Sequence, residues 1–172
     1  MSKTDTIALL IVTAVIIQRL YELVLANKNT QALLSQGAFE TGQKHYPLIV
    51  LLHAGWISSI LIWIIMGYAS LNGVFLGLYV LLQPLRLWVL KTLGKYWTTR
   101  VIIVPGRDLI KTGPYRWFKH PNYMTVICEI AILPLAFGAI EIAVIFSILN
   151  AIILSHRIKV ENASLNSHKP SV

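Results

Sequence analysis

The sequence contains one cysteine, Cys128, so no disulfide can form within the chain. Charge is also scarce: charged residues make up 13% of the 172 positions, about half the usual share of a soluble domain. Acidic residues are the rarer kind, with 7 Asp and Glu against 15 Lys and Arg, which gives a formal net charge of +8. A chain that is 56% hydrophobic and poor in charge does not stay disordered, because disorder requires the opposite balance. A disulfide scaffold and a disordered chain are both excluded.

Several motifs of soluble enzymes are missing as well. No Gly-x-Gly occurs, which excludes the glycine-rich dinucleotide fingerprint. No serine lies in a nucleophile elbow, and no spacing of Cys and His suits zinc, so we expect no metal. The basic excess could indicate nucleic-acid binding. Membrane orientation and contact with anionic headgroups explain it better, so we expect membrane lipids and no nucleic acid as partners.

What the chain has instead is a series of apolar runs about as long as a bilayer is thick. They predict an all-α, polytopic membrane protein that forms a single domain, 1–172, with about five transmembrane helices. The predicted helices are 6–26, 46–68, 71–90, 122–137 and 140–157. The short connections at 69–70 and 138–139 predict two helical hairpins.

The fourth predicted helix is short for a membrane span. Its 16 residues cover roughly 24 Å, less than the ~30 Å hydrocarbon core. Pro134 predicts a kink or an early end.

Basic residues predict the orientation of the bundle. Twelve of the fifteen lie in the connections 26–46 and 91–121 and in the tail 155–172, whereas the two hairpin turns contain none. The positive-inside rule places these segments in the cytoplasm, with the N-terminus outside and the C-terminus cytoplasmic. The connection 91–121 holds seven of the fifteen basic residues and is the one long polar connection, so we expect it to be a catalytic loop.

The first group of candidate residues opens the fourth helix. Pro121 occupies the position of a first helical residue, with His120 and Tyr123 on either side. A helix N-terminus carries partial positive charge and attracts a carboxylate or phosphate. The alternative is an interfacial belt, since aromatic and basic residues are enriched where helices leave the bilayer.

The second group closes the fifth helix. Arg157 and Glu161 are four residues apart and share one helix face. His120 precedes Gly138 by 18 residues and Arg157 follows it by 19, which places both about 27–28 Å from the hairpin turn. We therefore expect them at similar depth on adjacent helices. A surface ion pair is the alternative interpretation of Arg157 and Glu161.

Four charged residues lie inside the apolar runs. Glu129 is a functional candidate because intramembrane carboxylates usually face the bundle interior, although a neutral packing group is an alternative. Arg86 is expected to extend towards the cytoplasm. Arg19 and Glu22 are three residues apart and are expected to pair with each other.

Over roughly residues 81–165, the order and spacing of several short motifs resemble those of the isoprenylcysteine carboxyl methyltransferase family, a group of integral-membrane S-adenosylmethionine enzymes. Small bacterial members of alkylpyrone O-methyltransferase type are the most similar. The motifs that carry the resemblance are Leu93-Gly94-Lys95-Tyr96-Trp97-Thr98, Gly113-Pro114-Tyr115-Arg116, His120-Pro121-Asn122-Tyr123, Glu129, Leu133-Pro134, Arg157-Ile158 and Glu161.

The resemblance implies S-adenosylmethionine as cofactor and assigns roles to individual residues. The implied cofactor-binding residues are Gly113, Tyr115, His120, Pro121, Tyr123 and Glu161. Arg157 would orient the acceptor, and Glu129 would be a further catalytic or pocket group. Two positions depart from the family pattern: Lys119 stands where the family usually has arginine, and Asn162 where it usually has a second glutamate. Both changes bear on cofactor affinity.

The resulting hypothesis is a methyltransferase of the bacterial plasma membrane with its active site facing the cytoplasm. Its acceptor would be a lipophilic oxygen nucleophile, either a carboxylate or a pyrone or phenol hydroxyl. One alternative is N-methylation of an aminophospholipid. Another is a small interaction or transport subunit that uses Glu129 and Arg86 for assembly or ion passage. The sequence defines neither the acceptor nor the oligomeric state.

Overall fold

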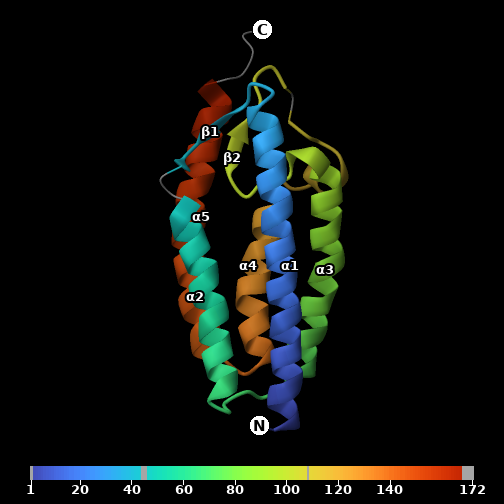
Figure 1. The fold of residues 1–172 in the computed structure, drawn as a ribbon, viewed down its shortest axis with the longest axis vertical. Coiled ribbons are helices and arrows are strands. Elements are labelled where there is room, and N and C mark those ends of the chain that lie inside the picture. Colours follow the sequence, from blue (N-terminus) through green and yellow to red (C-terminus); the bar gives the residue numbers. More distant parts are fainter. Residues whose placement is uncertain (1, 44–45, 108, 168–172) are drawn as a thin grey trace.

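The computed structural model describes residues 2–43, 46–107 and 109–167. The helices are α1 (Lys3–Leu34), α2 (Tyr46–Ile65), α3 (Gly73–Leu93), α4 (Pro121–Ala136) and α5 (Ile140–Ser167). The short elements are strands β1 (Phe39–Thr41) and β2 (Val101–Ile103) and the 3₁₀ turns η2 (Gly94–Tyr96) and η3 (Gly113–Arg116). The helices run along the long axis of the bundle, with the start of α1 at one end and both strands and the end of α5 at the other (Figure 1). The predicted all-α polytopic fold is confirmed.

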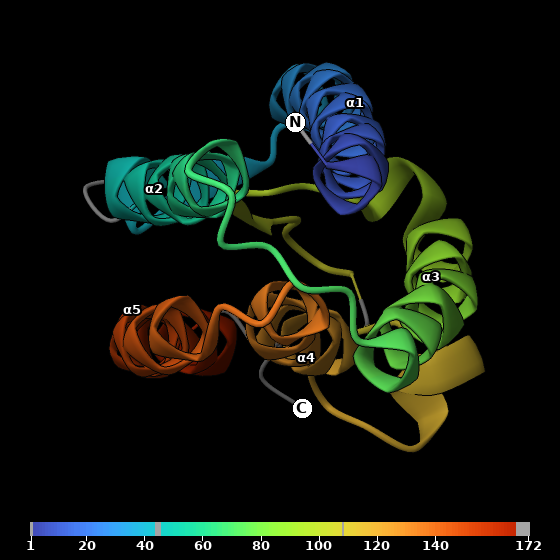
Figure 2. The same ribbon diagram turned by 90° about the horizontal axis from the view of Figure 1, so that it is seen from below.

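Four helices in the described part of the chain are long and apolar enough to cross a membrane: α1, α2, α3 and α5. The 16-residue α4 is shorter, as the sequence predicts. It packs between α3 and α5, with α1 and α2 on the opposite side of the bundle (Figure 2). This interior position buries Ile130 and Leu133, which lie in the main core with Trp56 and Ile60 of α2 and Val12 of α1.

Helix α1 is longer than the predicted 6–26. It begins with a capping box in which Ser2 and Asp5 bind each other's backbone N–H groups. It ends at Leu34, and its polar last part is held by tertiary contacts: Asn29 donates to the carbonyl oxygens of Gly94 at 3.2 Å and Trp97 at 2.8 Å.

Helix α5 also extends past its predicted end at 157, so much of the segment 155–172 is helical. The reason is tertiary, since Arg157 at the predicted end and Glu161 on the extension contact other parts of the chain. The predicted cytoplasmic residues Lys44 and Lys169 lie outside the described residues.

Two connections shape the ends of the bundle. At the end where α1 begins, the α4–α5 turn contains Gly138, whose φ of 73° favours glycine. The turn is joined to the α2–α3 connection by a hydrogen bond from Ser70 N to Phe137 O. At the opposite end β1 and β2 pair antiparallel, with Glu40 opposite Ile102. This ladder ties the α1–α2 connection to the loop between α3 and α4.

Candidate active site

A cavity of about 830 Å³ lies between the α3–α4 loop, the start of α4 and the last turns of α5. This volume is within the range of small-molecule binding sites. The sequence-predicted residues on its wall are Tyr115, His120, Tyr123, Arg157 and Glu161. The loop 93–119 supplies most of the rest.

His120 and Tyr123 form the part of the wall that belongs to α4. Pro121 starts the helix and is buried, while His120 precedes it as the N-cap residue, with a non-helical backbone. The His120 and Tyr123 rings stack with centroids 5.2 Å apart and an interplanar angle of 20°. Partial burial lowers the pKa of His120; the charge of Glu161, 3.8 Å from Nδ1, opposes this and Lys119 adds to it. The imidazole is therefore neutral at neutral pH.

Tyr123 joins α4 to α5. Its hydroxyl donates a short hydrogen bond to Glu161 Oε2 and accepts one from Arg157 Nε at 3.0 Å. Arg157 Nη2 also donates to the carbonyl oxygen of Thr99 in the α3–α4 loop, at 2.8 Å. The predicted equal depth of His120 and Arg157 agrees with this arrangement. The guanidinium is fixed from two sides at the cavity wall.

Tyr115 and Gly113 belong to η3. Burial, followed by the charge of Glu161, raises the pKa of Tyr115, so its hydroxyl remains a neutral donor. Gly113 does not line the cavity, but it has a φ of 56°. A Cβ at this position would meet Thr92 Oγ1 at 2.4 Å and Trp88 Nε1 at 3.2 Å. Gly113 therefore allows η3 to pack closely on α3 and carry Tyr115 to the cavity.

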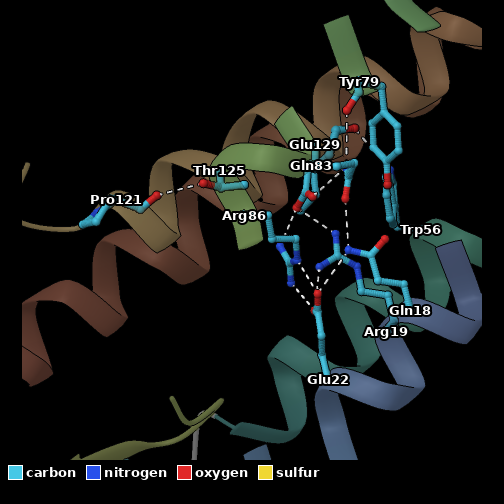
Figure 3. A network of polar contacts seen from close by, with 11 residues as sticks. Gln18, Arg19, Glu22, Trp56, Tyr79, Gln83, Arg86, Pro121, Thr125 and Glu129 are labelled. Atoms are coloured by element: carbon cyan, nitrogen blue, oxygen red, sulfur yellow. Dashed lines mark hydrogen bonds and ion pairs between the residues drawn. The ribbon is translucent and has the colours of Figure 1, made fainter. Parts of the chain in front are cut away.

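Glu129 lies apart from these residues. It is fully buried, does not line the cavity, and binds Arg86 and Arg19 (Figure 3). Arg86 does not reach the bundle surface by extending along the helix, because its side chain is buried between Glu22 and Glu129. Arg19 and Glu22 do pair, at 3.2 Å, as predicted.

Sequence reasoning did not single out two residues of the wall, Trp97 and Asn122. Trp97 Nε1 and Asn122 Oδ1 are buried and lack a hydrogen-bond partner among the described residues, as does His120 Nε2. Buried polar atoms are normally paired, so three such atoms on one cavity wall indicate a place for a polar ligand. Both residues lie in motifs that carry the family resemblance, and that position could have marked them as candidates.

The wall is strongly basic. Its cationic residues are Arg100, Arg107, Lys111, Arg116, Lys119 and Arg157. Glu161 is the acidic residue among the described lining residues. A concave surface lined by one sign of charge attracts ligands of the opposite sign. Within the described ranges no three His, Cys, Asp or Glu residues are grouped so that they could hold a metal ion.

Two curated proteins are similar to the chain over most of its length. A Bacillus subtilis protein, named as uncharacterized protein YpbQ, is 38% identical over 162 residues, which is 92% of this chain and 96% of that protein. An uncharacterized protein of Haemophilus influenzae is 25% identical over 152 residues, 86% of this chain and 88% of that protein. No solved structure matches the chain at a significant level.

The family model that matches is that of the isoprenylcysteine carboxyl methyltransferase family, over residues 75–167. The matched region begins near the start of α3 and includes the α3–α4 loop, α4 and α5, which together supply the cavity wall. The match covers more than half of the chain, and all the motifs that carry the resemblance lie within it. This chain belongs to the isoprenylcysteine carboxyl methyltransferase family.

Proposed function

We propose that this chain uses S-adenosylmethionine to methylate an oxygen of a lipophilic, anionic acceptor, a carboxylate or an acidic pyrone or phenol hydroxyl. Membership of the family implies a membrane methyltransferase. One observation carries the finer proposal: the fixed guanidinium of Arg157 shares a cavity wall with three buried polar atoms that lack partners among the described residues.

The residues of the wall fit the cofactor. S-adenosylmethionine supplies, when bound, an electrophilic methyl group on a positively charged sulfur. Glu161 offers a carboxylate to the positive charge, Trp97 Nε1 a donor, and Asn122 Oδ1 an acceptor. Tyr115 and Tyr123 add aromatic surface. Asn162, one of the two departures from the family pattern, does not line the cavity, whereas Lys119 does.

Arg157 is proposed to orient the acceptor. A guanidinium has five N–H donors in a planar fork that matches a carboxylate. Nε and Nη2 bind Tyr123 and Thr99, so the plane of the fork is fixed before the acceptor arrives. Methyl transfer is an in-line displacement that depends on alignment of the reacting atoms. An acceptor that is already ionised needs no strong base, and the basic wall favours that ionised form.

The proposed location is the plasma membrane of a bacterium, with the cavity facing the cytoplasm. The segments that line the cavity, which are the α3–α4 loop, the start of α4 and the last turns of α5, lie at the end of the bundle where α1 ends (Figure 1). Six described basic residues lie on the cavity wall. This distribution supports the cytoplasmic orientation through the positive-inside rule.

The test is transfer of labelled methyl groups from S-adenosylmethionine to a panel of hydrophobic carboxylates, pyrones, phenols and aminophospholipids by the purified protein in detergent. We expect label on the acidic oxygen acceptors. Label on aminophospholipids alone would replace the proposal with N-methylation. S-adenosylhomocysteine should raise the melting temperature by mass action. No shift at millimolar concentration, together with no labelled product, would contradict an enzymatic function.

A further inference from the structure

Four charged side chains from three helices form a closed ring inside the bundle. This charge ring consists of Arg19 and Glu22 of α1, Arg86 of α3 and Glu129 of α4 (Figure 3). Arg86 donates to Glu22 through Nε at 2.5 Å and through Nη2, and to Glu129 through Nη1 at 2.7 Å. Arg19 donates to Glu129 at 2.7 Å and to Glu22 at 3.2 Å. Each carboxylate binds both guanidinium groups, so the four charges cancel.

The ring is deeply buried and further hydrogen-bonded. Glu22, Arg86 and Glu129 are 5%, 4% and 0% exposed. Gln18 donates to Glu22 Oε1 at 3.1 Å and to Gln83 Oε1 at 3.0 Å. Ionisable groups inside a membrane protein are costly and usually serve function. A buried ion pair is weak evidence for stability, because desolvation offsets the attraction. Stability alone is therefore a poor explanation of the ring.

Helix α4 connects the ring to the cavity. Glu129 follows Tyr123 by six residues, about 9 Å along the helix. At 3.6 residues per turn the two side chains point about 120° apart around the helix axis. The ring therefore holds one face of α4, while Tyr123 binds Glu161 from another face. A rotation of α4 that opened the ring would also move Tyr123 away from α5.

Helix α1 has a second connection to the cavity wall. Asn29, two turns after Glu22, binds the carbonyl oxygens of Gly94 and Trp97, and Trp97 lines the cavity. Yet α1 lies before the region that the family model matches, which begins at residue 75. The family match therefore assigns no role to this helix.

We infer that Arg19 and Glu22 are positioning residues: through Arg86 and Glu129 they set the rotation of α4 that brings His120 and Tyr123 to Arg157 and Glu161. The inference rests on the proposed function. In this arrangement the N-terminal helix, which contributes no side chain to the cavity wall, determines its shape.

The experiment compares Glu22→Gln with the double variant Arg19→Met/Glu22→Gln. The single variant leaves two guanidinium groups facing one carboxylate, so its melting temperature should fall by several degrees. The double variant leaves the neutral pair Arg86–Glu129 and should recover most of that loss, because no buried charge is left without a partner. Tyr21→Phe is the matched control, since this neighbouring side chain is 68% exposed.

The readout is the Michaelis constant for S-adenosylmethionine in the labelled-methyl assay. If the ring positions α4, the double variant keeps a KM for the cofactor at least tenfold above wild type despite its recovered melting temperature. A merely structural role predicts a different result: misfolding lowers the active fraction and thus kcat, but leaves KM unchanged. The Tyr21→Phe variant should match wild type in both constants.

A double variant that regains the wild-type KM together with its melting temperature would overturn the inference. If Glu22→Gln does not accumulate, the double variant and wild type alone make the comparison. If the double variant does not accumulate either, Glu22→Asp, which keeps the charge and shortens the side chain by one methylene, replaces it with the same expected rise in KM. Failure of the proposed function is distinguishable, because the wild-type protein itself would then transfer no label.

Discussion

Tyr123 on α4 donates its phenolic proton to Glu161 on α5, 38 residues later in the chain, and accepts a hydrogen bond from Arg157 one turn before that glutamate. The Tyr123 hydroxyl therefore orients both Glu161, whose carboxylate is proposed to face the cofactor, and Arg157, whose guanidinium is proposed to bind the acceptor. Cofactor binding and acceptor orientation would therefore depend on the same hydrogen-bonding group.

Replacement of Tyr123 by Phe tests the role of this hydroxyl. The ring stack with His120 remains, while the hydroxyl that binds Glu161 and Arg157 is lost. We expect the Kd for S-adenosylhomocysteine to rise about tenfold, equivalent to about 1.4 kcal/mol. Calorimetric titration in detergent measures it. Tyr68→Phe is the control, because Tyr68 is 58% exposed and lies in the α2–α3 connection, away from the cavity wall. Equal affinities of the two variants would contradict the role of Tyr123.

Arg157→Lys separates acceptor orientation from cofactor binding. Lysine keeps the charge but loses the planar fork and cannot bind Tyr123 and Thr99 together in the same way. Turnover should fall about 10- to 100-fold, while the melting-temperature shift with S-adenosylhomocysteine stays close to that of wild type. Lys159→Arg on the exposed face of α5 should leave both unchanged. Full activity of Arg157→Lys would show that the guanidinium has no orienting role.

The pH dependence of stability should contain a contribution from His120. Its folded-state pKa is lowered, chiefly by burial, so the unfolded chain takes up the proton first as the pH falls. The contribution of His120 to the free energy of unfolding is therefore fully present above its unfolded-state pKa of about 6.5, and it is lost as the pH falls towards the folded-state pKa. The His120→Gln variant has no titrating group at this position, so it should not lose this contribution as the pH falls. Melting temperatures from about pH 7.5 to 5 should show wild type losing more than the variant; parallel curves would contradict it.

Gly113→Ala should destabilise the fold through η3. A side chain at a φ of 56° is strained, and its Cβ would meet Thr92 Oγ1 at 2.4 Å. We expect a loss of about 1–2 kcal/mol from the backbone conformation alone. Gly77→Ala is a matched control within α3, where a Cβ meets no atom within 4 Å, and it should be neutral or stabilising. Unfolding titrations of both variants in detergent make the comparison.

The sequence predicts the bundle well because membrane helices are defined by local composition. The depth of two residues on one hairpin is also predictable, since helix rise is constant, and Arg157 and His120 do line the same cavity. Rotation about a helix axis is not predictable in this way. Glu129 has the depth expected for a pocket group, but its side chain faces α1 and α3.

The burial of Arg86 is not predictable for a similar reason. Its partner Glu22 is 64 residues away in sequence, and a single sequence gives no sign of that pairing. The long ends of α1 and α5 are missed because their polar residues gain helical structure from distant contacts, such as those of Asn29 with Gly94 and Trp97.

The shortness of α4 has a consequence for how the proposed lipophilic acceptor reaches the cavity. Tyr123 precedes Gly138 by 15 residues, about 22 Å along the helix, and His120 by 18 residues, about 27 Å, so both lie closer to the turn than the ~30 Å thickness of the hydrocarbon core. With that turn at one membrane surface, both side chains lie beneath the opposite headgroup plane. Each methylene that remains among lipid tails avoids about 0.8 kcal/mol of exposure to water. On the proposed function, a long-chain acceptor would therefore be methylated without extraction from its leaflet.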